Sequence, residues 1–81
     1  MGQAFSVEMD RKQLLNAAVG ERVRERRLGK GDTLKNIAAS TGLSVSLISQ
    51  IELGKSAASV YTLHKLSDAL EVKMTYFFES I

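Results

Sequence analysis

The 81-residue sequence contains no cysteine, no proline and no tryptophan. Without disulfides a core of this size is marginally stable, so helix packing and contact with a partner subunit must supply the stability. Long apolar runs are missing as well. No stretch approaches the roughly 20 residues that span a bilayer, and the first residues, MGQAFSVEMDRK, lack the apolar segment of a signal peptide. We therefore expect a single cytoplasmic domain that does not enter a membrane.

Residue types that perform catalysis or bind metals are also scarce. The one histidine, His64, lies in a helical stretch, and there is no carboxylate pair, phosphate-binding glycine loop or metal-ligand spacing. We therefore do not expect an enzyme, and we expect no catalytic residue, no cofactor and no metal site. A binding site for a small-molecule ligand is not evident either.

Positive charge is in slight excess, and its distribution is more informative than its sum. The formal net charge of +2 is by itself a weak indication of nucleic-acid binding. Basic side chains concentrate between residues 22 and 30, whereas the segment after Ser67 is acidic. One end of the chain is therefore suited to phosphates. The alternative is an ordinary solvated helix face, because Glu21 and Glu25 lie among the arginines.

Residues 33–54 have the pattern of two short helices around a tight turn. The first is expected over 34–41, ending at Gly42, because glycine adopts the left-handed C-terminal conformation without steric cost. Ser44 is expected to cap the second helix, 45–53, by accepting a free backbone N–H. Small and branched residues mark the inner faces of both helices: Ile37, Ala38, Thr41, Ile48 and Ile51. This pattern is typical of the helix-turn-helix, whose second helix enters the major groove of DNA.

The same stretch resembles the Cro/repressor-type (XRE) helix-turn-helix family. Its segment SLISQIELGK is similar to a signature that recurs in that family, and SVYTLHKLSDALEV is similar to the helix that follows it. The resemblance extends over residues 19–78, most of the chain. It implies an all-α fold, a compact five-helix repressor-like domain that binds double-stranded operator DNA, usually as a homodimer, and regulates transcription.

The remaining segments are expected to supply the other helices of this domain. Residues 1–10 are aperiodic and are expected to form a flexible arm, so the domain proper covers 11–81. A helical pattern begins at Asp10 and ends near Lys30, with an apolar stripe of Leu14, Leu15, Ala18, Val19 and Val23. Ser59 is expected to cap a helix over 60–70, and Thr75 a last short helix. The buried stripe of the 60–70 helix is expected to be Val60, Leu63, Leu66, Ala69 and Leu70.

Two residues of the first helix need an explanation. Gly20 lies inside the helical pattern, where glycine costs about 1 kcal/mol relative to alanine, so we expect a close-packing site there. Arg27 continues the apolar stripe of Val19 and Val23. In the family that the chain resembles, the matching arginine pairs with a glutamate at the end of the recognition helix, here Glu52. The resemblance thus implies a partly buried, structural Arg27–Glu52 ion pair.

Base contacts are expected from the second helix of the motif. A helix in the major groove presents its first two turns to base edges. Gln50 is the best candidate, because its amide can pair with both N6 and N7 of adenine. The alternative for Gln50, and still more for the serines, is an ordinary solvated position. The outward-facing residues are Val45, Ser46, Leu47, Ser49 and Gln50, of which we predict base contacts for Val45, Ser46, Ser49 and Gln50.

Phosphate contacts are expected from helix termini and from nearby cations. The N-terminus of the 34–41 helix offers free N–H groups and the positive end of a dipole. Such contacts position the protein without reading sequence. The candidates are Thr33, Lys35, Ser44, Lys55 and Ser56, with Arg22 and Arg26 at longer range.

Apolar residues gather at the end of the chain, where the resemblance implies a two-fold interface. Operators of such domains usually carry two half-sites about one helical turn apart. One of Phe77 and Phe78 is expected to close the core while the other faces a partner. The predicted homodimer interface consists of Tyr76, Phe77, Phe78 and Ile81.

The chain departs from the family pattern at three positions. Leu34 replaces a glutamine that reaches a phosphate, Leu53 replaces arginine or asparagine, and Ala58 replaces a proline. Two alternatives therefore stay open: a protein-interaction module of the same fold, of the antitoxin or coactivator kind, and the DNA-binding part of a longer ligand-sensing regulator. As a DNA-binding protein it is expected in the cytoplasm, of bacterial or phage origin and associated with the nucleoid.

Overall fold

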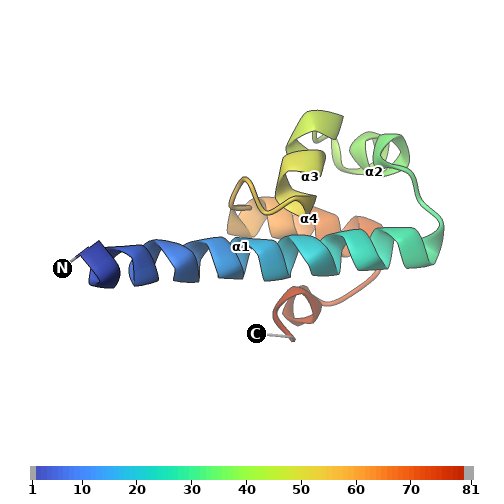
Figure 1. Ribbon diagram of the computed structural model, residues 1–81. Coiled ribbons are helices and arrows are strands. Elements are labelled where there is room, and N and C mark those ends of the chain that lie inside the picture. The colour runs from blue at the N-terminus through green and yellow to red at the C-terminus, as the bar shows by residue number, and fades with distance from the viewer. Residues whose placement is uncertain (1, 80–81) are drawn as a thin grey trace.

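The computed structural model describes the backbone of residues 2–79 and the side chains of residues 11–79. Within them the fold is compact and all-helical, as predicted, but the count of five helices is corrected. The last element is a five-residue 3₁₀-helix, which begins after Lys73, so Thr75 lies inside it and does not cap it. The elements (Figure 1) are α1 Gly2–Lys30, α2 Leu34–Thr41, α3 Val45–Glu52, α4 Val60–Leu70 and η1 Met74–Phe78.

Helix α1 is the longest element and sets the shape of the molecule. Its 29 residues span about 43 Å at the usual rise per residue, close to the longest dimension of 45 Å. The helix begins at Gly2, earlier than the expected start at Asp10, so the residues predicted to form an arm are helical here. The sequence has no proline to stop it, and extending a helix is far easier than nucleating one.

The caps around α2 and α3 lie where the sequence predicts them. The Thr33 hydroxyl accepts the Asn36 N–H at 3.0 Å, and the Ser44 hydroxyl accepts the Leu47 N–H at 3.0 Å. Gly42 has φ of 76° and its N–H donates to Ala38 at 2.9 Å. These short-range hydrogen bonds satisfy free backbone groups at the helix ends.

Helix α4 begins as expected and ends in an unexpected way. The Ser59 hydroxyl accepts the Thr62 N–H at 3.1 Å. At the other end Glu71 adopts a left-handed conformation with φ of 58°, which is uncommon for a residue with a side chain. Val60, predicted to be buried, is 75% exposed, and the buried stripe of α4 begins at Leu63.

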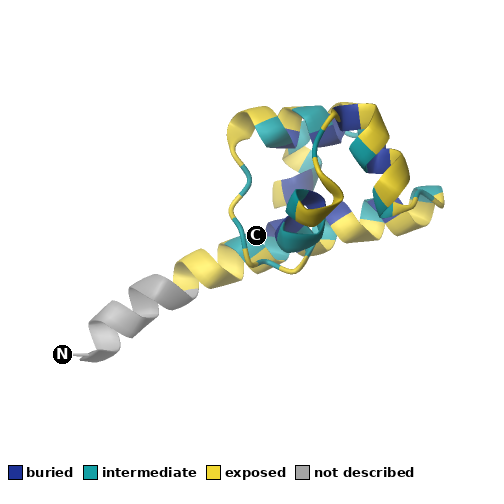
Figure 2. Cartoon of the chain, turned by 90° about the horizontal axis from the view of Figure 1, so that it is seen from above, coloured by how far each residue is buried: buried dark blue, intermediate teal, exposed yellow. Residues whose placement is uncertain are grey.

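The core lies where the four α-helices and η1 meet, and Figure 2 shows its buried positions on the inner faces of the helices. The expected stripe of α1 begins only at Val19. Leu14 and Leu15, predicted to be part of it, are exposed, because α1 has passed beyond the other elements at that point. The core consists of Val19, Val23, Ile37, Ile48, Ile51, Leu63, Leu66, Leu70 and Phe77.

None of the helices in the described part of the chain is long and apolar enough to cross a membrane. Among residues 11–79, no three histidine, aspartate or glutamate side chains are grouped so that they could hold a metal ion.

Candidate nucleic-acid interface

The turn between α2 and α3 is held by a buried threonine. The Thr41 hydroxyl donates to the Ile37 carbonyl at 2.7 Å and accepts the Leu43 N–H at 3.1 Å. From outside the motif, the Lys65 ammonium of α4 donates to the Thr41 carbonyl at 3.1 Å. The sequence carries no local signal for this last contact, since the two residues are 24 positions apart. Together these bonds fix α3 relative to α2.

One side of helix α3 lies outside the core. Ile48 and Ile51 are buried, whereas Val45 and Ser46 in the first turn are exposed and Ser49 and Gln50 are half-buried. The four predicted base-contact residues therefore lie outside the core on one short helix. Leu47 differs from the prediction: it is half-buried and packs against the core.

A glycine lets α1 pass close beneath α3. Gly20 is buried, and a Cβ built on it would lie 2.0 Å from the Ile51 carbonyl oxygen and 2.8 Å from that of Glu52. No real Cβ approaches a backbone oxygen so closely, so only glycine fits. The predicted close-packing site is therefore the place where α1 supports the C-terminal half of α3.

Arg27 and Glu52 join the same two helices by a bidentate ion pair. The Arg27 Nε and Nη2 atoms donate to the two Glu52 carboxylate oxygens at 2.7 and 3.0 Å, and its Nη1 donates to the Asp32 carbonyl at 3.0 Å. The side chains are only 11% and 5% exposed. The hydrogen bond from Arg27 to Glu52 raises the pKa of Arg27, against a smaller lowering by burial. The pair is thus a structural support for α3, away from its exposed face.

The candidate phosphate contacts fall into two groups. The first surrounds the two helices of the motif. Thr33 and Ser44 sit at the N-termini of α2 and α3, Lys35 and Lys55 are exposed, and Ser56 is half-buried. Neither lysine forms an ion pair within residues 11–79. This group can present backbone N–H groups and positively charged side chains to a polyanion.

The second group, Arg22 and Arg26, is engaged elsewhere. The Arg22 Nε donates to the Tyr76 carbonyl at 3.0 Å and its Nη2 to Glu79 at 2.9 Å, while the Arg26 Nε donates to the Leu70 carbonyl at 2.8 Å. Both arginines thus face the end of α4 and η1, and Figure 1 shows η1 on the opposite side of α1 from α3. Their expected role at phosphates stays a prediction, although both side chains already make structural contacts with residues far away in the sequence.

The residues expected at a dimer interface do not share one environment. Phe77 is fully buried and belongs to the core, which corrects its assignment to the interface. Phe78 is 42% exposed. Tyr76 is half-buried, with its ring 3.8 Å from the Arg22 guanidinium carbon. Ile81 lies outside the described residues. Of the three described residues, Phe78 is the apolar side chain that remains available at the surface.

Comparisons with known proteins agree with this geometry. A family model described as helix-turn-helix matches residues 23–77. The uncharacterized HTH-type transcriptional regulator y4aM of Sinorhizobium fredii is 29% identical over 95% of this chain and 57% of its own length. The chain therefore spans little more than half of that relative.

Two solved structures share the fold. The restriction-modification controller protein C.AhdI from Aeromonas hydrophila has a TM-score of 0.75 at 30% identity, covering 78% of this chain and 96% of that one. An HTH_3 family transcriptional regulator from Vibrio cholerae has a TM-score of 0.80 at 28% identity, covering 85% of this chain and 39% of that one. The fold thus occurs both in a protein of similar size and as part of a longer regulator.

Proposed function

This chain belongs to the helix-turn-helix (HTH_3, XRE-type) family, and on that premise we propose that it binds an operator in double-stranded DNA as a homodimer, with α3 in the major groove. The family is one of DNA-binding transcriptional regulators and not of enzymes. The operator, the groove contact and the dimer on an inverted repeat are our proposal for this chain.

The exposed first turn of α3 is the observation that carries this proposal. Val45 and Ser46 are exposed at the end of the helix that points away from the core, and Gln50 lies one turn further along. Helix α1 supports α3 from the core side, through the close contact at Gly20 and through the Arg27–Glu52 ion pair. A short helix held in this way can enter the groove without rearrangement, and its polar side chains then meet base edges.

Phosphate contacts on both sides of α3 would fix its register. Thr33 and Lys35 at the start of α2 would reach one backbone strand, and Lys55 and Ser56 after α3 the other, with the Ser44 cap between them. Without Arg22 and Arg26 the number of expected phosphate contacts is small. We therefore expect an affinity that depends on two coupled half-sites and falls with salt.

Gln50→Ala should weaken operator binding selectively. Losing a bidentate contact to adenine costs about 1–3 kcal/mol of discrimination, so affinity for the operator should fall about tenfold or more while affinity for an unrelated duplex stays unchanged. The measurement is fluorescence anisotropy on both duplexes.

Lys35→Ala is the matched control for Gln50→Ala. A lost phosphate contact should weaken both duplexes alike and reduce the slope of log K against log salt by about 1. If Gln50→Ala also weakened both duplexes equally, Gln50 would not be reading a base.

Exposed apolar residues near α3 favour a second candidate, a protein-interaction module. Leu53 at its C-terminal end is 60% exposed and Val45 is 39% exposed. Nonspecific duplex binding that falls steeply with salt indicates phosphate neutralisation and thus DNA. Absence of duplex binding at low salt, with the protein folded, would favour the interaction module. The third reading, the DNA-binding part of a longer regulator, is compatible with either outcome, and the chain spans 57% of the Sinorhizobium relative.

A further inference from the structure

The part of α1 that precedes the core carries two exposed leucines. Residues 11–15 are all exposed, and Leu14 and Leu15 expose 68% and 44% of their surface. Figure 2 shows this segment beyond the point where other elements pack against α1. In proteins, tertiary packing of an apolar side supplies most helical stability, and residues 11–15 lack such packing. A partner that covers the leucines would supply that packing.

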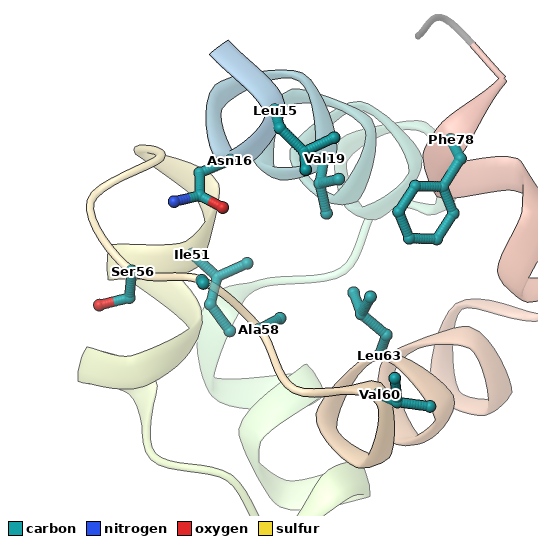
Figure 3. Close-up of a pocket in the computed structure, with 10 residues that line it drawn as sticks. Leu15, Asn16, Val19, Ile51, Ser56, Ala58, Val60, Leu63 and Phe78 are labelled. Carbon is teal, nitrogen blue, oxygen red and sulfur yellow. The ribbon is translucent and has the colours of Figure 1, made fainter. Parts of the chain in front are cut away.

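An apolar groove opens beside the same segment. It has a volume of about 230 Å³ and lies between α1, the loop after α3, α4 and η1. Figure 3 shows Leu15 and Val19 on one wall, Val60 and Leu63 on the other, and Phe78 at the end. Val60 is 75% and Phe78 42% exposed. The exposed leucines of α1 and the apolar groove thus lie next to each other on the molecule.

We infer that residues 11–15 of α1 form a dimerisation arm. Its Leu14 and Leu15 cover the groove between Val60 and Phe78 of a second copy of the chain. The inference rests on the proposed homodimer and names the surface that forms it. A two-fold interface brings the same patch of both copies together. This face can therefore pair with itself, so that the leucines of each copy fill the groove of the other.

The size of the interface favours this arrangement. A stable dimer buries about 800 Å² per partner, from about 20–30 residues, whereas η1 has five residues and its Phe77 is buried in the core. Residues 11–15 would add to this contact and would bury the two leucines. It would also continue the surface around Phe78 without a break, because Leu15 and Phe78 line the same groove.

Charge on the two surfaces is complementary. Arg11 and Lys12 are exposed on the arm, one turn before Leu15. Glu79 is the neighbour in sequence of Phe78, which lines the groove, and its side chain is 60% exposed even while it pairs with Arg22. When an arm lies on a partner's groove, positive charge approaches negative charge, which favours the correct register.

Leu14→Glu tests the arm, with Leu28→Glu as the matched control in the same helix. Leu28 is 52% exposed and lies near the other end of α1, so its substitution should leave association unchanged. Leu14→Glu should raise the dimer dissociation constant about tenfold or more in sedimentation velocity, as expected for an interface hot spot. Thermal melts by circular dichroism show that both variants remain folded.

Cross-linking gives a second, independent measurement. The chain has no cysteine, so Leu14→Cys and Val60→Cys proteins can be prepared separately, with tags of different mass, and mixed. Oxidation should give a mixed disulfide dimer, which can form only between two chains. A Leu28→Cys protein mixed with Val60→Cys should give none.

The outcomes separate this inference from the proposed function. If the unaltered protein is monomeric at tens of micromolar, both the homodimer and the arm are wrong. If Phe78→Glu dissociates the dimer but Leu14→Glu does not, and no mixed disulfide forms, the arm alone is wrong. If Leu14→Glu weakens duplex binding while the dimer persists, the arm contacts DNA and the inference is overturned.

Discussion

Replacing Gly20 by alanine is expected to destabilise the domain by about 3 kcal/mol or more, at the upper end of overpacking costs. The added Cβ would lie 2.0 Å from the backbone carbonyl oxygen of Ile51. A backbone oxygen in a helix cannot swing aside as a side chain can, so α1 and α3 must separate. The separation disrupts the core around Val23 and Ile51. This loss outweighs the gain of about 1 kcal/mol that alanine brings to an ordinary helix position.

Gly29→Ala in the same helix is the control for Gly20→Ala. A Cβ at Gly29 meets nothing within 4 Å, so alanine should stabilise the domain there, by about 0.5–1 kcal/mol. Urea unfolding followed by circular dichroism measures both effects. The same glycine-to-alanine substitution is thus expected to lower the stability at one position and to raise it at the other. A Gly20→Ala protein as stable as the unaltered protein would mean that α1 and α3 are further apart than in this structure.

Glu52→Gln is expected to destabilise the domain by about 3 kcal/mol, because it leaves the charge of Arg27 buried and unpaired. The Glu52 side chain is 5% exposed and accepts two hydrogen bonds from Arg27. Glutamine keeps the shape but provides only one accepting oxygen and no charge. For a domain with a total stability in the usual range of about 5–15 kcal/mol, such a loss is large.

An exposed pair provides the comparison for Glu52→Gln. Glu79 pairs with Arg22 at 2.9 Å, but its side chain is 60% exposed. Exposed ion pairs contribute about 0–1 kcal/mol, so Glu79→Gln should change the thermal midpoint little. Equal shifts for the two variants would show that solvent reaches the Arg27–Glu52 pair and that it does not support α3.

What the sequence predicts well is local. The caps at Thr33, Gly42, Ser44 and Ser59 depend on hydrogen bonds within three or four residues, so each can be recognised from residue type and spacing. Gly20 could be recognised as a contact site because a glycine inside an otherwise regular helical pattern has a cost that packing must offset. The partner of Arg27 was implied by the family resemblance, since periodicity alone shows only an arginine in an apolar stripe.

What the sequence does not predict depends on how the two ends of the chain meet. Periodicity cannot decide between Phe77 and Phe78, because a five-residue 3₁₀-helix has no α-helical face. Arg22 looks like a free cation in the sequence, yet it pairs with Glu79, 57 positions away. The exposure of Leu14, Leu15 and Val60 likewise follows from where α1 and α4 leave the core. These are the residues from which we infer the dimer face.

Selection of DNA from a random duplex pool, followed by sequencing, tests the proposed function most directly. If α3 reads bases from a two-fold dimer, the enriched DNA should contain an inverted repeat with half-site centres about one helical turn apart. The unaltered protein should bind it more tightly than Gln50→Ala does. A folded protein that enriches no sequence would contradict operator binding and would favour a module whose partner is another protein.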